Sequence, residues 1–105
     1  MKPSIFLLTC ANDKEAEKII KSLLEKRLIV CAKKISVEST FYWQKKIEKS
    51  PEILLLMESD ESKFEEMEKE ILKIHSYKTF VLESLPVKTT QDVKKWLSKE
   101  LRDKK

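Results

Sequence analysis

Two runs of strand-forming residues occupy the middle of the chain. Leu28–Ile47 and Ile53–Met57 are rich in β-branched and aromatic residues, and they flank the polar break Glu48–Pro51. This pattern predicts a β-hairpin that turns at the break, because proline cannot donate to a strand ladder. A first arm of about 20 residues would span about 66 Å, whereas a chain of this length has a radius of gyration of about 13 Å. We therefore expect this arm to bend near Ser36–Thr40, or to project and pair outside the subunit.

Three consecutive aromatic residues, Phe41, Tyr42 and Trp43, lie in the outer half of this arm. Successive side chains of a strand point to opposite faces, so large rings are expected on both faces of the hairpin. One face can pack on the subunit's own core, and the other needs a second cover. The pattern indicates an oligomer that forms through the hairpin.

The remaining apolar residues follow strand-like or helical spacing, and they complete the predicted element order. We predict one α+β domain over residues 1–105: a ferredoxin-like βαββαβ sandwich with a long β-hairpin and an extra C-terminal helix. The first strand is expected between the third and the fourth. The other predicted elements are a strand Ser4–Thr9, a helix capped by Asn12 with Glu15 in a capping box and ending near Arg27, a helix capped by Ser59 or Asp60 and ending near His75, a strand Thr79–Leu85, and a helix opened by Thr89 with Asp92.

Composition and charge exclude several classes of protein. The 22 basic and 18 acidic residues give a net charge of +4, and they are dispersed instead of forming a basic footprint, which disfavours a nucleic-acid partner. The apolar run near the N-terminus is too short for a membrane span and lacks a signal-peptide cleavage site, so we expect a cytoplasmic protein without a membrane partner. The chain contains no glycine, which excludes glycine-rich phosphate loops and favours a thermostable protein.

The residues capable of metal or nucleophilic chemistry are few. Cys10 and Cys31 are expected as free, mostly buried thiols, since the predicted topology keeps their strands apart. His75 is the only histidine, and no local metal-binding spacing surrounds it. We interpret His75 as a hydrogen-bonded residue at a helix end, with the imidazole and the two thiols apart. No enzyme is predicted from these residues.

Several short motifs in a fixed order resemble those of one known family over almost the full chain. They are Thr9 before the Ala16 helix, Leu28–Ala32, Ser39–Glu48, His75-Ser76-Tyr77, Leu85-Pro86-Val87 and the late Trp96. In this order they resemble the CutA-like divalent-cation tolerance proteins.

The resemblance implies a ferredoxin-like subunit in a homotrimer, with Phe41, Tyr42, Trp43 and Trp96 at the trimer interface. It also implies a role in tolerance of divalent metal ions such as copper, with Cys31 and His75 as metal ligands near subunit boundaries.

Departures from the family pattern fall in the motif around His75 and in the hairpin. Lys78 and Val81 stand where the family has acidic residues, and Lys45 stands where it has a hairpin glycine. Because hard divalent cations prefer oxygen ligands, we expect metal binding at this motif to be weak or lost.

Two other functions remain open. A trimeric small-ligand or protein-binding module resembling the PII signalling proteins would hold an anionic partner in inter-subunit clefts lined by Lys45, Lys46, Tyr77 and Lys78. An enzyme that uses His75 and Tyr77 for acid–base chemistry ranks last.

Overall fold

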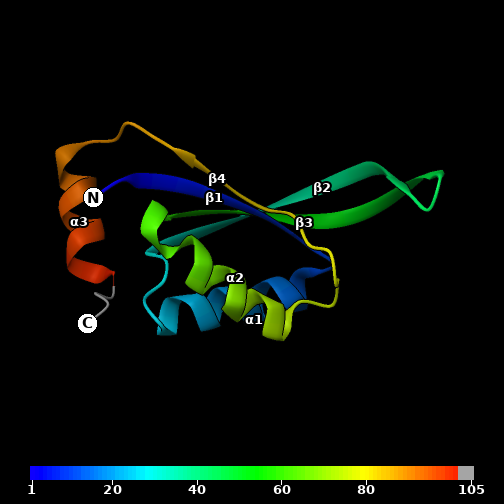
Figure 1. Ribbon diagram of the computed structural model, residues 1–105, viewed down its shortest axis with the longest axis horizontal. Helices are drawn as coiled ribbons and strands as arrows, with labels where there is room; N and C mark the ends of the chain where they lie inside the picture. The colour runs from blue at the N-terminus through cyan, green and yellow to red at the C-terminus, as the bar shows by residue number, and fades with distance from the viewer. Residues whose placement is uncertain (102–105) are drawn as a thin grey trace.

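The computed structural model describes residues 1–101, so the basic tail Arg102–Lys105 lies outside the described residues. The predicted ferredoxin-like α+β fold is confirmed (Figure 1). Within residues 1–101 no helix is long and apolar enough to span a membrane. The elements are β1 (Pro3–Cys10), α1 (Asp13–Glu25), β2 (Cys31–Trp43), β3 (Lys46–Asp60), a 3-10 turn (Glu61–Lys63), α2 (Phe64–Ile74), β4 (Leu82–Pro86) and α3 (Gln91–Glu100).

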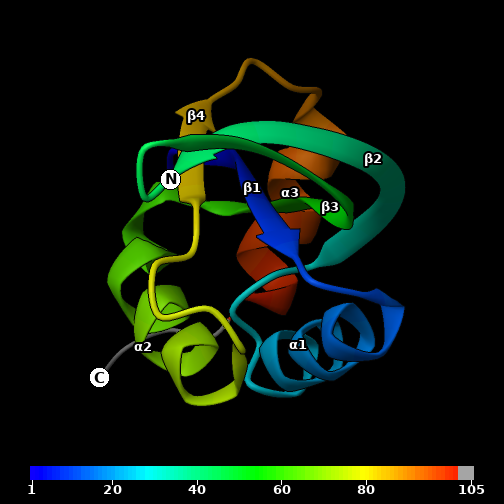
Figure 2. The same cartoon turned by 90° about the vertical axis from the view of Figure 1, so that its right-hand side faces the viewer.

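One antiparallel sheet with strand order β2-β3-β1-β4 forms the centre of the subunit, so β1 lies between β3 and β4 as predicted. Helices α1 and α2 lie side by side against one face of this sheet (Figures 1 and 2). We call this the helix face and the opposite one the outer face. Alternation along β1 and β3 sends Phe6, Leu8, Leu55 and Met57 into the core at the helix face, where each is fully buried.

The outer face of the sheet is apolar but only partly covered. Leu7 pairs with Leu56 and Thr9 with Leu54, so these side chains share the face away from the helices. Ile35, opposite Leu54, is 44% exposed. Partly exposed apolar side chains gathered on one face of a sheet are typical of a surface that packs on another layer.

The hairpin turn lies at Gln44 and Lys45, so its predicted position at Glu48–Pro51 is wrong. Trp43 pairs with Lys46 across a two-residue turn in which Gln44 and Lys45 have φ values of 51° and 69°. Positive φ at both central residues is the conformation of a type I′ turn. The twist of this turn matches that of the strands, and the strand pairing that it allows outweighs the steric cost of positive φ for residues other than glycine.

Proline does not interrupt the ladder in this hairpin. Pro51 is part of β3 and lies opposite Glu38. β1 ends opposite Ile53, so no strand of residues 1–101 pairs with the other side of β3 at Pro51. At such an edge the missing backbone N–H of proline costs no ladder hydrogen bond.

The hairpin projects beyond the body of the subunit. Lys46–Glu52 pairs only with β2, and Figure 1 shows this end of the hairpin reaching past both helices. The molecule is accordingly elongated, with extents of 45 × 26 × 21 Å. The projection agrees with the expectation from the length of the first arm.

Element ends differ from the predicted ones by a few residues. Thr90, not Thr89, caps α3 by accepting a hydrogen bond from the Val93 N–H. β4 begins at Leu82, because Thr79–Val81 belongs to the irregular connection that carries Phe80 towards the core. Asp60, one of the two residues predicted to cap the second helix, caps the 3-10 turn that leads into it, and α2 itself begins after Lys63 without a side-chain cap.

Candidate functional site

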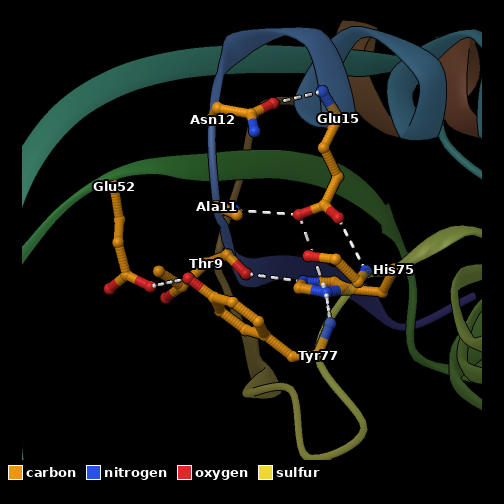
Figure 3. Close-up of polar contacts among 8 residues, drawn as sticks. Thr9, Ala11, Asn12, Glu15, Glu52, His75 and Tyr77 are labelled. Atoms are coloured by element: carbon orange, nitrogen blue, oxygen red, sulfur yellow. Dashed lines mark hydrogen bonds and ion pairs between the residues drawn. The ribbon is translucent and has the colours of Figure 1, made fainter.

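His75 occupies the junction between the end of α2 and the end of β1. Its backbone ends α2 with ψ 137°, and its ring, fully shielded from solvent, stacks on Phe80. The ring Nε2 lies 2.8 Å from the carbonyl oxygen of Thr9, and Nδ1 lies 3.0 Å from the backbone nitrogen of Tyr77 (Figure 3). A carbonyl only accepts and a backbone N–H only donates, so Nε2 carries the proton and Nδ1 the lone pair.

Glu15 joins the start of α1 to the segment after α2. Asn12 caps the helix by accepting a hydrogen bond from the Glu15 N–H, as predicted. The Glu15 side chain, however, does not return to Asn12 as a capping box would: Oε2 accepts the Ala11 N–H at 2.8 Å and Oε1 accepts the Ser76 N–H at 2.6 Å. Burial alone would raise the pKa of this carboxyl, but these hydrogen bonds hold the pKa below its usual value.

Cys10, at the end of β1, completes a compact group with these two residues. One potential ligand atom each from Cys10, Glu15 and His75 lies within 4.8 Å of the others. The expectation that the imidazole and both thiols lie apart is therefore wrong for Cys10. Burial and the neighbouring carboxylates of Glu15 and Glu52 raise the pKa of this thiol to about 12, so the thiol is protonated at neutral pH.

Tyr77 extends the same network to β3. Its hydroxyl donates a hydrogen bond of 2.5 Å to Oε2 of Glu52, and its ring lies 4.8 Å from the ring of His75 (Figure 3). Burial and the Glu52 hydrogen bond raise the pKa of Tyr77 above its usual value. The hydroxyl is thus a fixed hydrogen-bond donor that joins the segment after α2 to the base of the projecting hairpin.

Cys31 lies elsewhere in the subunit and does not fit a metal site shared with His75 in the same chain. It pairs with Glu58 on the outer face, and Glu58 pairs with Ile5, about 13 Å along β1 from Thr9. Its sulfur instead accepts a 3.7 Å hydrogen bond from Lys33. Any metal held by Cys31 and His75 would require ligands from two subunits, so that pair stays a prediction.

The residues predicted to line a ligand cleft are not brought together by one subunit. Lys45 and Lys46 lie at the tip of the hairpin, about 20 Å along β3 from the Glu52 that contacts Tyr77. Lys78 is exposed in the segment after α2. A cleft combining these residues needs a second subunit.

The residues predicted at the trimer interface are exposed in the subunit. Tyr42 is 76% exposed and Trp43 51%, while Phe41 on the same strand and Trp96 on α3 are exposed to about 40%. Large apolar side chains at this exposure are available for contact with another chain.

Sequence reasoning missed Cys10 and Glu15 as partners of His75. Their positions held a signal, because Cys10 ends a strand and Glu15 lies in the first turn of the next helix, so a tight connection brings both to one corner. The spacing of local metal motifs cannot detect such a group, since His75 arrives from the far end of α2.

Comparisons with known proteins agree with this architecture. Residues 4–100 match the family profile described as CutA1 divalent ion tolerance protein. The divalent-cation tolerance protein CutA of Archaeoglobus fulgidus is 35% identical over 80 residues, covering 76% of this chain and 78% of the relative. That of Pyrococcus horikoshii is 31% identical over 93% of this chain and 97% of its own. The solved structure of the A. fulgidus protein, described as periplasmic, superposes with a TM-score of 0.93 at 29% identity, covering 95% of this chain and 99% of its own.

Proposed function

This chain belongs to the CutA1 divalent ion tolerance family, and we propose that it forms a homotrimer. The trimer acts as a scaffold or sensor in the response to divalent metal ions such as copper. The role involves no catalysis, and we place it in the cytoplasm. The similar proteins of Archaeoglobus fulgidus and Pyrococcus horikoshii are named for divalent-cation tolerance, which supports the metal-related part of the proposal.

The observation that supports the assembly is the outer face of the sheet together with the projecting hairpin. Leu7, Leu54, Leu56 and Ile35 form an apolar surface that one subunit leaves partly exposed. Phe41 and Trp43, which alternate onto the same face of β2 as Ile35, continue this surface along the hairpin. A second and third copy of the chain would remove both from water, and burial of apolar surface is the main driving force of obligate assembly.

Metal binding through the family motif is proposed to be weak. Cys31 and His75 are its remaining donors, and within one subunit Cys31 lies on β2 opposite Glu58 whereas His75 lies against Thr9 near the end of β1. Lys78 and Val81 supply no carboxylate oxygen. If this motif binds metal only weakly, Cys31→Ala should change the affinity of the purified protein for Cu²⁺ by no more than about threefold, where a tenfold change corresponds to about 1.4 kcal/mol.

A complementation assay tests the function itself. A host strain made copper-sensitive by deletion of its own family member is expected to regain growth on elevated copper when it expresses this chain. A variant that folds but stays monomeric, Leu56→Glu, should not restore growth, whereas Leu72→Glu on the exposed side of α2 should. Equal growth of the deletion strain with and without the unmodified chain would contradict the proposal.

A further inference from the structure

Cys10, Glu15 and His75 form a donor group that the family resemblance did not indicate. Within residues 1–101 it is the one cluster of three or more such side chains with ligand atoms close enough to share an ion. Cys10 lies at the end of β1, Glu15 in the first turn of α1 and His75 at the end of α2. Figure 3 shows how Glu15 and His75 lie relative to each other. Cys10 and the His75 ring are fully shielded, and Glu15 is 9% exposed.

The orientation of His75 suits metal coordination. Nε2–H donates to the Thr9 carbonyl, which leaves Nδ1 unprotonated, at 3.7 Å from Oε2 of Glu15. Histidines that bind metals in proteins commonly donate their other ring N–H to a carbonyl, which fixes both the tautomer and the ring plane. Here that supporting hydrogen bond exists before any metal binds.

The charges of the group favour a divalent ion. A thiolate and a carboxylate together carry two negative charges, and a neutral imidazole adds none. A divalent cation therefore produces an electrically neutral buried site, which avoids the cost of an uncompensated charge in the interior. The Cys10 S–H bond breaks as the S–metal bond forms, and the proton passes to solvent.

We propose that Cys10, Glu15 and His75 bind one Zn²⁺ ion per chain, with water as the fourth ligand. Zn²⁺ accepts sulfur, nitrogen and oxygen donors together, at bond lengths of about 2.0–2.3 Å. Donors in a tetrahedral site lie about 3.5 Å apart at these bond lengths, so the present spread of up to 4.8 Å must contract by about 1 Å.

Contraction costs one hydrogen bond. The Tyr77 N–H points at the Nδ1 lone pair and must turn away when the metal binds. Residues 75–81 form no helix or strand, so this segment can adjust without breaking a ladder. Metal binding is therefore expected to be coupled to the position of Tyr77 and, through its hydroxyl, to Glu52 at the base of the hairpin.

Titration of the purified full-length chain with Co²⁺ tests the proposal, because Co²⁺ occupies Zn²⁺ sites and a thiolate ligand adds a near-ultraviolet charge-transfer band. The unmodified protein should bind one Co²⁺ per chain with this band, and Zn²⁺ should displace it. Cys10→Ala keeps a small apolar residue in the core and should abolish the band and weaken Zn²⁺ binding at least tenfold. The matched variant Cys31→Ala should behave as the unmodified protein does.

Three results would overturn the proposal: no charge-transfer band in the unmodified protein, a band that survives Cys10→Ala, or a band that is lost in Cys31→Ala. A circular dichroism spectrum of each variant verifies that it is folded. The proposal rests on the metal response proposed above, but the two fail separately. A trimer that restores copper tolerance without binding Co²⁺ contradicts only the Cys10 site, whereas a protein that binds Co²⁺ without restoring growth contradicts only the cellular role.

Discussion

At the scale of single residues, Glu15 links three segments that are separate in the sequence. It accepts hydrogen bonds from Ala11 before α1 and Ser76 after α2, and it faces the ring of His75. A buried carboxylate with several donors stabilises the fold as long as it stays ionised.

Glu15→Gln is expected to lower the free energy of unfolding by about 1–3 kcal/mol at pH 7, because it weakens these charged hydrogen bonds. The folded-state pKa of Glu15 lies below its unfolded value, so this contribution is present above the unfolded pKa of about 4.3 and is lost as pH falls through the folded pKa. Urea unfolding at pH 7 and pH 3 should show the difference between the two proteins shrinking at the lower pH. Glu25→Gln, at an exposed position on α1, is the control. A difference that is the same at both pH values would contradict this account.

Tyr77→Phe should also destabilise the protein, by about 1–3 kcal/mol, because it removes the hydroxyl donor from a buried carboxylate. Glu52 is only 8% exposed and accepts this hydrogen bond at 2.5 Å. Tyr42→Phe removes a hydroxyl from a side chain that is 76% exposed and should change little. Denaturant unfolding of both variants at one protein concentration makes the comparison, and equal losses would show that the Glu52 contact contributes nothing specific.

At the scale of elements, the hairpin shows what hydrophobic patterning predicts and where it stops. The existence, order and pairing of its strands followed from β-branched and aromatic runs, as did the stripes of α1 and α2. The position of the turn did not follow, because the pattern led us to interpret Pro51 as a strand breaker. Pro51 lies at an edge of β3, where proline does not break the strand. Gln44 and Lys45 carry no glycine or asparagine signal, so the type I′ turn was invisible in the sequence.

Lys45→Gly is expected to stabilise the hairpin by about 0.5–1 kcal/mol, since glycine reaches φ 69° without the steric cost of a Cβ atom. The same substitution one residue later, Lys46→Gly, falls in β3 and should destabilise it. Thermal unfolding of the two variants at matched concentration separates these effects. A lower melting temperature for Lys45→Gly would show that the Lys45 side chain contributes more to stability than its positive φ costs.

The candidate site was only partly predictable for a physical reason. His75 was found as the single histidine at a helix end, and its hydrogen-bonded environment was expected. Its closeness to Cys10 depends on how α2 returns to the end of β1, which is a tertiary contact between residues far apart in the sequence. Local spacing carries no information about such a contact.

At the scale of the whole molecule, the single subunit leaves large apolar side chains exposed. Its elongated shape, the apolar outer face and the exposed aromatic residues of the hairpin all place apolar surface in water. The proposed function requires that copies of the chain assemble through this surface.

Leu56→Glu should convert the assembly to monomers, because it places a charge in the middle of the outer face, where Leu56 pairs with Leu7 and Lys33. Leu72→Glu introduces the same charge at a side chain that is 62% exposed on α2, and it should leave the assembly intact. Sedimentation at micromolar concentration distinguishes the two variants. Dissociation by both, or by neither, would argue against the outer face as the contact surface.

The native mass of the unmodified protein shows whether the chain forms the proposed trimer. Light scattering during size-exclusion chromatography, with and without added Cu²⁺, is expected to give three times the chain mass of 12.4 kDa in both conditions. A stable monomer at micromolar concentration would contradict the account, because the outer face and the aromatic hairpin would then have no partner in solution.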